Sequence, residues 1–347
     1  MKLGSVEVGK GHKPYFIAEM SGNHNQSLDK ALRIVEAAAK TGAHALKIQT
    51  YTPDTMTLNY DKDEFFIADS KSLWKGNSLY QLYEKAMTPW DWHEPIQRRC
   101  KELGLEFFST PFDETSVDFL ESLGVNFYKI ASFENNDLPL IKKVAQKKKP
   151  MIISTGMATV TEISEAVTTA KENGAEGVIL LKCTSAYPSD PKESNLATIP
   201  NMRETFKVDV GLSDHTMGFA IPVAASVLGA CVIEKHFTID RSEGGVDSAF
   251  SMEPHEFKQM IESVNNAWDA LGAIHYGLTD AEKKSRVFRR SIYVACDVKK
   301  GDVLTHKNTR VIRPGLGLEP KHFENVLGRT FRGDYKLGTA LRWDMLS

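Results

Sequence analysis

VGLSDHT at residues 210–216 and VIEKHFT at residues 232–238 share one pattern, a short apolar run followed closely by a histidine. Runs of this kind are typical of parallel strands that are buried on both faces. His215 and His236 therefore stand where two such strands would emerge from a sheet. A polar imidazole at that end of a strand indicates a metal site or a catalytic site at the rim of an α/β fold.

The same pattern recurs along most of the chain. Short apolar runs alternate with segments of helical periodicity, and some of these segments end at a glycine such as Gly42. Thr115 and Thr161 are the predicted N-caps of two helices. Eight strand–helix units over roughly 250 residues predict a (β/α)8 barrel. An open doubly wound sheet is the alternative, but no glycine-rich fingerprint follows the first run. The eight runs lie at residues 15–20, 44–50, 105–110, 126–132, 150–155, 177–185, 208–214 and 231–238.

The rest of the chain is predicted to form an insertion, a linker and a small second domain. The longest connection, at residues 51–90, follows the second predicted strand and is expected at the mouth of the barrel. The barrel domain is predicted to span residues 1–276, and the basic, polar stretch at 277–290 to be a linker. Residues 291–347 contain short strands and glycine turns, which indicates a β-rich domain whose own core is marginal.

Composition narrows the class of protein. The chain has 347 residues, of which 41% are hydrophobic, and a formal net charge of -2, so it can build a full core and gives no electrostatic reason to bind nucleic acid or a membrane surface. The first residues lack an apolar signal stretch and no run is long enough to span a bilayer, so a cytoplasmic location is expected. Cys100, Cys183, Cys231 and Cys296 are scattered, which favours reduced thiols.

Polar residues gather at the carboxyl ends of the predicted strands, where barrel active sites are built. For any single residue the commoner role is ordinary, because a serine after a strand is usually an N-cap and a lysine usually reaches solvent. Two lysines together with several hydroxyl donors, however, suit a phosphate or a carboxylate. The set comprises Glu19, Lys47, Gln49, Ser109, Thr110, Lys129, Ser132, Glu134, Ser154, Thr155, Thr184, Ser185, Ser213, His215, Glu234 and His236.

His215 and His236 end consecutive strands, which are neighbours in a barrel. Two imidazoles there can share a divalent ion and leave coordination positions open for water and substrate, as a catalytic metal requires. Either histidine alone is more often a hydrogen-bonded core residue, but the pair favours a metal. Glu19 is then placed to hold a metal-bound water or to act as a base.

The sequence resembles the sialic acid synthase family, whose members condense phosphoenolpyruvate with an N-acetylated sugar. The resemblance covers nearly the whole chain, in order, and its final part resembles the antifreeze-like (SAF) domain that ends these synthases. It therefore implies an α/β fold, a (β/α)8 TIM barrel followed by a small SAF domain. The matching segments are IAEMSGNHNQSLDKA (17–31), ALKIQTY (45–51), FSTPFD (108–113), YKIASFE (128–134), ISTGMA (153–158), LLKCTSAYP (180–188), VGLSDHT, VIEKHFT, DVKKGDVLT (297–305) and VIRPGLG (311–317).

The resemblance also implies roles for individual residues. His215 and His236 would bind a divalent metal, Mn²⁺ first and Mg²⁺ or Co²⁺ as alternatives, with Glu19 beside the reacting centre. Ser185 departs from neuraminate synthases, which commonly have Asn there, and it can donate to a phosphate only over a shorter reach. Phosphoenolpyruvate would be held by Lys47, Thr110, Lys129, Ser132, Ser154, Ser185 and Ser213, and the sugar by Gln49, Glu134, Tyr187, Asp247, Phe250 and Arg313. Arg313 would reach the sugar in the partner subunit of a domain-swapped homodimer.

Within the family, the loop RSEGGVDSAFSMEP (241–254) is most similar to that of pseudaminic acid synthases. Neuraminate synthases tend to have charged residues after the aspartate, whereas here Asp247 is followed by Ser248, Ala249 and Phe250. A less polar loop suits a 6-deoxy sugar such as 2,4-diacetamido-2,4,6-trideoxy-L-altrose. The resemblance thus implies synthesis of pseudaminic acid with C–O cleavage of phosphoenolpyruvate. Legionaminic acid and N-acetylneuraminate synthases remain alternatives, followed by a metal-dependent aldolase and a non-catalytic carbohydrate-binding protein.

Overall fold

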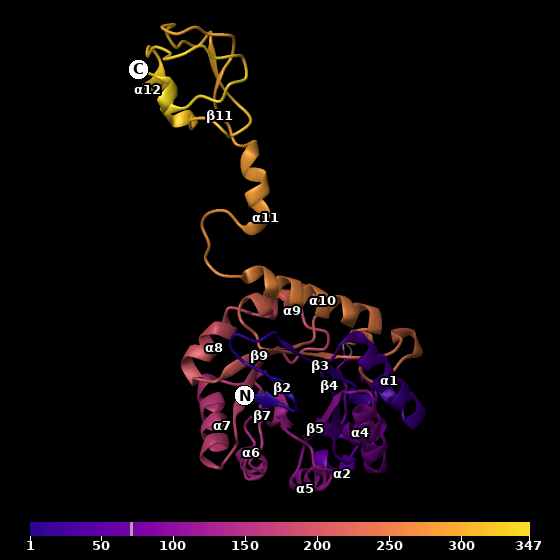
Figure 1. Ribbon diagram of the computed structural model, residues 1–347. Coiled ribbons are helices and arrows are strands. Elements are labelled where there is room, and N and C mark those ends of the chain that lie inside the picture. Colours follow the sequence, from indigo (N-terminus) through magenta and orange to yellow (C-terminus); the bar gives the residue numbers. More distant parts are fainter. Residues whose placement is uncertain (70–71) are drawn as a thin grey trace. The chain divides into compact units, whose positions relative to one another are not determined.

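The computed structural model describes residues 1–69 and 72–347, which form two compact units, residues 1–272 and 273–347 (Figure 1). Residues 70–71, inside the insertion predicted at 51–90, lie outside the described residues. The first unit contains eight parallel strands, each followed by a helix, and the helices surround the strands. The predicted TIM barrel is therefore confirmed.

The strands of the barrel all fall within the eight predicted runs or extend them by one residue. Their order is β5-β4-β3-β10-β9-β8-β7-β6, and β5 and β6 lie in contact at its two ends, although no ladder pairs them among the described residues. The strands are β3 (Tyr15–Glu19), β4 (Ala45–Thr50), β5 (Glu106–Pro111), β6 (Tyr128–Ile130), β7 (Met151–Ser154), β8 (Val178–Cys183), β9 (Asp209–Asp214) and β10 (Val232–His236).

The helices that follow these strands are amphipathic and bury one face against the sheet. Gly42 ends α1 in the left-handed conformation, with φ 90°, as its position predicts. The eight helices are α1 (Leu28–Thr41), α4 (His93–Glu102), α5 (Glu114–Ser122), α6 (Leu138–Ala145), α7 (Val160–Glu172), α8 (Thr198–Phe206), α9 (Ala220–Val227) and α10 (Pro254–Leu271).

Two predicted N-caps are wrong. Helix α5 is capped by Asp113, whose carboxylate accepts hydrogen bonds from the backbone N–H groups of Thr115 and Ser116. Helix α7 is capped by Thr159, which forms a capping box with Glu162. Both helices thus begin before Thr115 and Thr161, because an earlier residue in each case offers a side-chain acceptor to the free N–H groups of the first turn.

Alternation along each strand separates the interior of the barrel from the surface beneath the helices. On β3, Phe16 and Ala18 belong to the core under the helices, whereas Ile17 belongs to a second cluster inside the barrel. This interior cluster is entirely apolar apart from Tyr15 and Cys231 and lies toward the amino ends of the strands. Its members from the strands and their starts are Tyr15, Ile17, Ala45, Phe108, Phe127, Ile152, Ile179, Leu181, Cys231 and Val232.

A short hairpin covers the amino end of the barrel. Strands β1 (Lys2–Leu3) and β2 (Val6–Glu7) pair antiparallel, and Leu3 and Val8 pack into the interior cluster. Leu3 has no exposed surface. The hairpin therefore covers the interior cluster at the end of the barrel that lies opposite to the predicted site.

The insertion between β4 and α4 contains two short helices, α2 (Pro53–Met56) and α3 (Leu79–Ala86). Ser78 caps α3 through a capping box with Gln81. Phe66 pairs with Ser78 in an isolated bridge, so the two halves of the insertion are joined across residues 67–77.

The second unit is small and has its own core. Strands β11 (Ser291–Val294) and β12 (Thr309–Ile312) pair antiparallel, and a short helix, α12 (Phe323–Val326), follows them. Ile292, Val294 and Leu341 are among the buried residues of this core. The predicted linker is not wholly irregular, because Thr279 caps a helical turn, α11 (Asp280–Lys283), through a capping box with Glu282.

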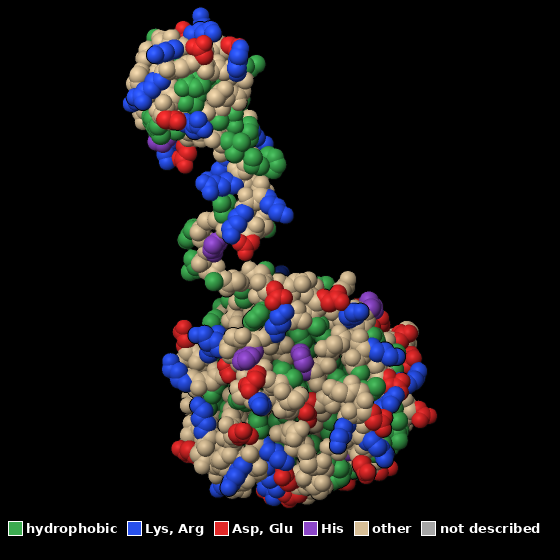
Figure 2. Space-filling model, in the orientation of Figure 1, with side chains coloured by type: hydrophobic (Ala, Val, Ile, Leu, Met, Phe, Trp, Pro, Cys, Tyr) green, Lys and Arg blue, Asp and Glu red, His purple; other side chains and the backbone are tan. Residues whose placement is uncertain are grey.

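The surface carries charges of both signs side by side, as the near-zero net charge predicts (Figure 2). Among the described residues, none of the helices has the length and hydropathy needed to cross a bilayer. All four cysteines are free.

We expect the substitution Leu3→Ala to destabilise the barrel by about 2–5 kcal/mol, because it removes buried methyl groups from the hairpin that covers the interior cluster. Urea unfolding followed by tryptophan fluorescence would measure the change. Leu58→Ala is the matched control, since Leu58 is 67% exposed and should change the stability by less than about 0.5 kcal/mol. Equal effects of the two substitutions would contradict the role given to the hairpin.

Candidate active site

A polar layer lies directly above the apolar cluster inside the barrel. On most strands, the interior residue two positions after an apolar one is polar, so Glu19 follows Ile17 and Lys47 follows Ala45. The ladder between β3 and β4 pairs Glu19 with Lys47, which puts the two side chains at one level. All members of this layer are buried, namely Glu19, Lys47, Thr110, Lys129, Ser154, Ser213 and Glu234.

Four of these side chains form a charged cluster. Lys47 Nζ lies 2.6 Å from Glu19 Oε2 and 3.8 Å from Glu234 Oε1, and Lys129 Nζ lies 3.3 Å from the same Glu234 oxygen. Lys47 also lies within hydrogen-bond distance of Thr110 Oγ1, at 3.4 Å. Two positive and two negative groups thus balance each other where water is excluded, which is the condition for keeping charges buried.

Burial and ion pairing shift the pKa values of these groups in different directions. Burial raises the pKa of Glu19, although Lys47 opposes the shift. Burial lowers the pKa of Lys129, and the neighbouring Glu234 only partly offsets this effect. For Glu234, burial would raise the pKa, but the two lysines hold it below its usual value. Incoming anionic groups of a ligand would therefore compete with the carboxylates for Lys47 and Lys129.

A cavity of about 520 Å³ opens at the carboxyl ends of the strands, next to this layer. Gln49 connects the two, because it lines the cavity and its Nε2 donates to Glu19 Oε1 at 3.1 Å. The sequence-predicted residues that line the cavity are Gln49, Ser132, Glu134, Ser185, Tyr187, His236 and Asp247. A larger cavity, of about 780 Å³, lies at the amino end of the barrel beside Leu3 and α4 and contains none of them.

Hydroxyl groups meet beside Gly156, after β7. Ser132 Oγ accepts a hydrogen bond from Gly156 N at 3.1 Å. A Cβ atom at Gly156 would lie 2.2 Å from Ser185 Oγ and 2.7 Å from Ser132 Oγ, so no side chain fits there. Ser154 Oγ is buried and has no partner in the protein. An unpaired buried hydroxyl next to such a cradle is free to donate to a ligand.

His215 and His236 lie side by side, with ring centroids 5.3 Å apart. His215 Nδ1 lies 3.0 Å from Thr184 O, and donation to that carbonyl leaves Nε2 as the ligating atom. His236 Nδ1 is buried without a partner, and burial holds its pKa well below the usual value, so the ring is neutral. Burial alone would lower the pKa of His215, but its contacts with Cys183 and Thr184 raise the pKa above the usual value, so this ring ligates an ion only once it is deprotonated. Two adjacent imidazoles then fit a divalent ion.

Protein ligands beyond the two histidines are not in place. Within the described residues, no group of three or more His, Cys, Asp or Glu side chains could hold a metal ion. Any ion at this pair would therefore keep coordination positions for water and substrate oxygens, as a catalytic site does and a structural zinc site does not.

Two carboxylates face the cavity from different segments. Asp247 comes from the loop after β10 and is fixed by Ser21 Oγ, which donates to it at 2.5 Å. Glu134, at the end of the 3₁₀ turn after β6, has a buried Oε2 atom without a partner. Burial raises the pKa of Glu134 to about 7, although Lys129 opposes the shift. A carboxyl group with this pKa can exchange a proton near neutral pH.

Phe250 and Arg313, two further predicted sugar contacts, do not line the cavity. Phe250 is only 2% exposed and is not on the cavity wall, because its ring packs 5.0 Å from that of His236 and 5.3 Å from that of Tyr187. Arg313 lies in the second unit, directly after β12. Phe250 therefore packs against the His236 ring outside the cavity, and the role of Arg313 stays a prediction.

Three residues of the strand-end set have structural partners instead. Ser109 faces outward between strands and donates to Ile48 O at 2.9 Å. Thr155 Oγ1 donates to Leu181 O, and Thr184 Oγ1 donates to Glu193 O. Their hydroxyls satisfy backbone carbonyls, so these side chains belong to the scaffold of the site.

Some features of the site were not predicted from the sequence. Glu234 belongs to the predicted strand-end set without a role of its own, and the structure makes it the shared partner of both lysines. Cys183 lies 4.0 Å, Sγ to Nδ1, from His215, and continues the interior row of Leu181. Alternation along β8 could have found Cys183. Trp74 and Tyr83, which come from the insertion and line the cavity, carried no signal in the sequence.

The model of the NeuB family matches residues 34–276, and that of the SAF domain matches residues 289–347. The chain belongs to the NeuB family. The matches confirm the resemblance to sialic acid synthases and the SAF domain in the second unit.

The NeuB-family relatives align almost from end to end. A pseudaminic acid synthase from Campylobacter jejuni (serotype O:23/36, strain 81-176) is 44% identical over 342 residues, which are 99% of this chain and 98% of the relative. An N,N'-diacetyllegionaminic acid synthase from Legionella pneumophila is 36% identical and covers 99% of both chains. The crystal structure of an N-acetylneuraminic acid synthetase from Leptospira borgpetersenii, in complex with citrate, has a TM-score of 0.73 at 29% identity, over 82% of this chain and 94% of that one.

We expect Glu134→Gln to stabilise the protein more at pH 8 than at pH 5. The pKa of Glu134 is about 7 in the folded state and ordinary in the unfolded state, so its ionisation costs stability as the pH rises between these values. The cost reaches at most about 3 kcal/mol above pH 7 and is absent in the glutamine variant. Urea unfolding at both pH values would measure it, with the exposed Glu64→Gln as the charge control. An equal effect of Glu134→Gln at the two pH values would contradict the shifted pKa.

Proposed function

We propose that this NeuB-family protein condenses phosphoenolpyruvate with 2,4-diacetamido-2,4,6-trideoxy-L-altrose to give pseudaminic acid and phosphate. As a family member that aligns end to end with nine-carbon sugar acid synthases, it is a transferase that forms a C–C bond. The observation that carries the proposal is the pair of buried lysines, with free hydroxyl donors, next to a cavity that contains His236.

The polar layer is suited to phosphoenolpyruvate. Lys47 and Lys129 provide two positive charges for its phosphate and carboxylate, and Ser154 provides an unpaired hydroxyl. Ser132 and Ser185 add donors beside Gly156, where the missing side chain leaves room for an oxygen. Thr110 and Ser213 complete the set, since Thr110 neighbours Lys47 and Ser213 Oγ donates to Glu234 at 3.2 Å.

The cavity is suited to the sugar. Gln49, Glu134, Tyr187 and Asp247 offer hydrogen-bonding groups on its wall, and His236 lies at the end nearest to the polar layer. A sugar in its open-chain form would place its aldehyde there. A divalent ion, Mn²⁺ in our proposal, would be held by His215 and His236 and would polarise the aldehyde carbonyl when bound.

In the proposed reaction, C3 of phosphoenolpyruvate attacks C1 of the sugar, and water adds to C2 of the resulting cation. Glu19, held by Lys47 and Gln49, orients this water or takes its proton. The tetrahedral intermediate then loses phosphate by C–O cleavage and leaves a 2-keto acid of nine carbons. The lysines bind the departing phosphate and stabilise its charge.

Arg313 enters the proposal through a second copy of the chain. It would reach the N-acetyl group of the sugar in the barrel of the partner subunit of a domain-swapped homodimer. The family membership and the small separate core of the SAF unit support this assignment. Arg313→Ala should then raise KM for the sugar and leave KM for phosphoenolpyruvate unchanged.

We expect phosphate release from phosphoenolpyruvate when the protein is supplied with Mn²⁺ and 2,4-diacetamido-2,4,6-trideoxy-L-altrose. The D-manno counterpart of this sugar and N-acetylmannosamine serve as competing substrates in the same assay. Preference for the D-manno sugar would indicate a legionaminic acid synthase, and preference for N-acetylmannosamine a neuraminate synthase. Turnover of the sugars without phosphoenolpyruvate would indicate an aldolase, and silence with all three would overturn the proposal.

The metal assignment has its own test. His236→Ala should lower kcat by at least about 100-fold and abolish Mn²⁺ binding measured by calorimetry, because it removes one of the two proposed ligands and the described residues offer no larger ligand group. Ser109→Ala is a control, since its hydroxyl serves the scaffold. Full activity of metal-stripped protein would end the assignment.

A further inference from the structure

One wall of the cavity is apolar and comes from a segment that the proposed chemistry does not use. The described residues of the insertion between β4 and α4 that line the cavity are Tyr51, Met56, Ile67, Trp74, Leu79, Leu82, Tyr83 and Ala86. Asp247, Glu134 and His236 line other parts of the same cavity. A ligand that touches the polar groups therefore also meets the insertion.

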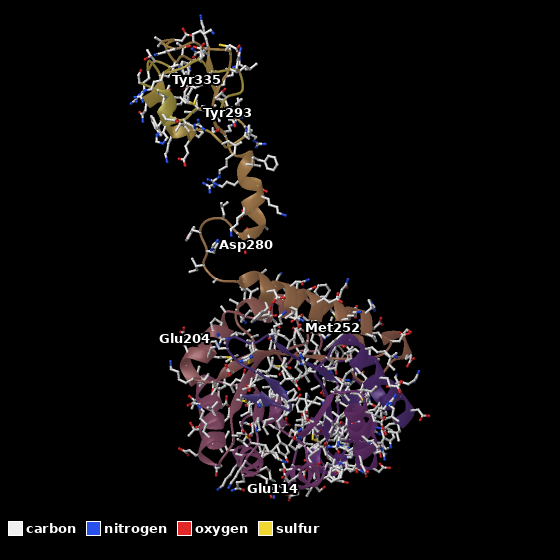
Figure 3. All side chains as sticks on the ribbon, in the orientation of Figure 1. Glu114, Glu204, Met252, Asp280, Tyr293 and Tyr335 are labelled. Carbon is white, nitrogen blue, oxygen red and sulfur yellow. The ribbon has the colours of Figure 1, made fainter. Side chains whose placement is uncertain are left out.

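The insertion is fixed to the loop that carries Asp247. Trp74 Nε1 donates to Val246 O at 2.9 Å, which ties the insertion to residues 241–253. Ile67 is held from both sides, because its N–H donates to Asn77 O and its carbonyl accepts from Gly76 N. Met252 lies at the far end of the same loop, near α10 (Figure 3). Its backbone N–H donates to the carbonyl of His236 at 2.8 Å, which fixes this end of the loop beside His236. The wall is thus part of the built site.

A row of aromatic rings gives the cavity a direction. The ring of Tyr187 lies 4.4 Å from that of His215 and 6.2 Å from that of Trp74. On the other side, the ring of Tyr51 lies 5.9 Å from that of Tyr83. With the sugar aldehyde at the histidines, as in the proposed reaction, Tyr187 lies between that end and Trp74, and the insertion would face the remainder of the sugar.

Hydrogen-bonding groups are scarce on this wall. Of the eight lining residues from the described part of the insertion, only Tyr51, Trp74 and Tyr83 carry side-chain N–H or O–H groups. The indole N–H is already used by Val246, so the hydroxyls of Tyr51 and Tyr83 are the groups left on this described wall to contact a ligand. A methyl group fits such a wall, whereas a hydroxyl buried there without a partner would lose affinity by roughly ten- to hundredfold.

We propose that the insertion selects the sugar: Ile67, Leu82 and Trp74 bind the apolar substituents at the end remote from the aldehyde, a deoxy methyl and an acylamino methyl, and reject a hydroxymethyl group. Tyr83 contributes a single hydrogen bond, which suits an acylamino oxygen. The sequence places specificity in residues 241–254, but the structure gives the apolar contact to the insertion. This inference rests on the proposed synthase reaction.

The test compares two sugars that differ only at C6, the trideoxy substrate and its 6-hydroxy analogue, in the phosphate-release assay with the full-length protein. For the natural chain we expect kcat/KM to favour the deoxy sugar. Ile67→Ser should reduce this preference by roughly 10-fold or more, because it offers the C6 hydroxyl a partner and removes apolar surface. KM for phosphoenolpyruvate should stay unchanged, since Ile67 lines the cavity proposed for the sugar, whereas Lys47 and Lys129 of the polar layer are proposed to hold phosphoenolpyruvate.

Two further variants complete the experiment. Leu82→Thr, in α3, tests the same prediction at a second position in case Ile67→Ser alters folding. The melting temperature of each variant shows whether its folding is altered. Leu58→Ser is the matched control, because Leu58 belongs to the same insertion, is 67% exposed and does not line the cavity. An unchanged preference in folded Ile67→Ser and Leu82→Thr would overturn the inference and leave the synthase reaction intact. No phosphate release by the natural chain with any sugar would overturn both.

Discussion

The ion pair between Lys47 and Glu19 lies inside the barrel, where the two side chains are 4% and 1% exposed. Charges are costly in such a place unless each has a partner at close range. Glu234 is the close partner of Lys129 and, together with Glu19, also pairs with Lys47. The cluster therefore needs β3, β4, β6 and β10 in their observed registers, since a shift of one residue would turn a charged side chain into the apolar core beneath the helices.

The apolar cluster and the hairpin below it keep those registers. Leu3 covers the amino end of the barrel. Along each interior row, alternation then places apolar side chains toward the amino ends of the strands and polar side chains toward the carboxyl ends. The result is a site with its charges already paired and its hydroxyls partly unpaired. Such a site gains hydrogen bonds when an anion enters, because Ser154 and the cradle at Gly156 have no better partner in the protein.

Segments outside the barrel strands shape the remainder of the site. Asp247 and Trp74 come from two loops that are far apart in sequence and joined by the hydrogen bond from Trp74 to Val246. Chemistry is thus carried by the strands, which are rigid, whereas selection among sugars falls to loops, which can vary without disturbing the barrel. The two corrections in the cavity, at Phe250 and in the origin of the apolar wall, both concern these loops.

By itself, the sequence determined the barrel, its eight strands and nearly all polar residues of the interior layer, because buried parallel strands leave a strong apolar pattern and their ends are easy to locate. The helix end predicted at Gly42 is confirmed for the same local reason. The N-caps predicted at Thr115 and Thr161 are wrong, because neighbouring residues compete to cap a helix. The sequence did not predict that Ser109 faces outward, that Glu234 pairs with both lysines or that the insertion forms the apolar wall. These features depend on contacts between residues distant in the chain, and local patterns do not encode such contacts.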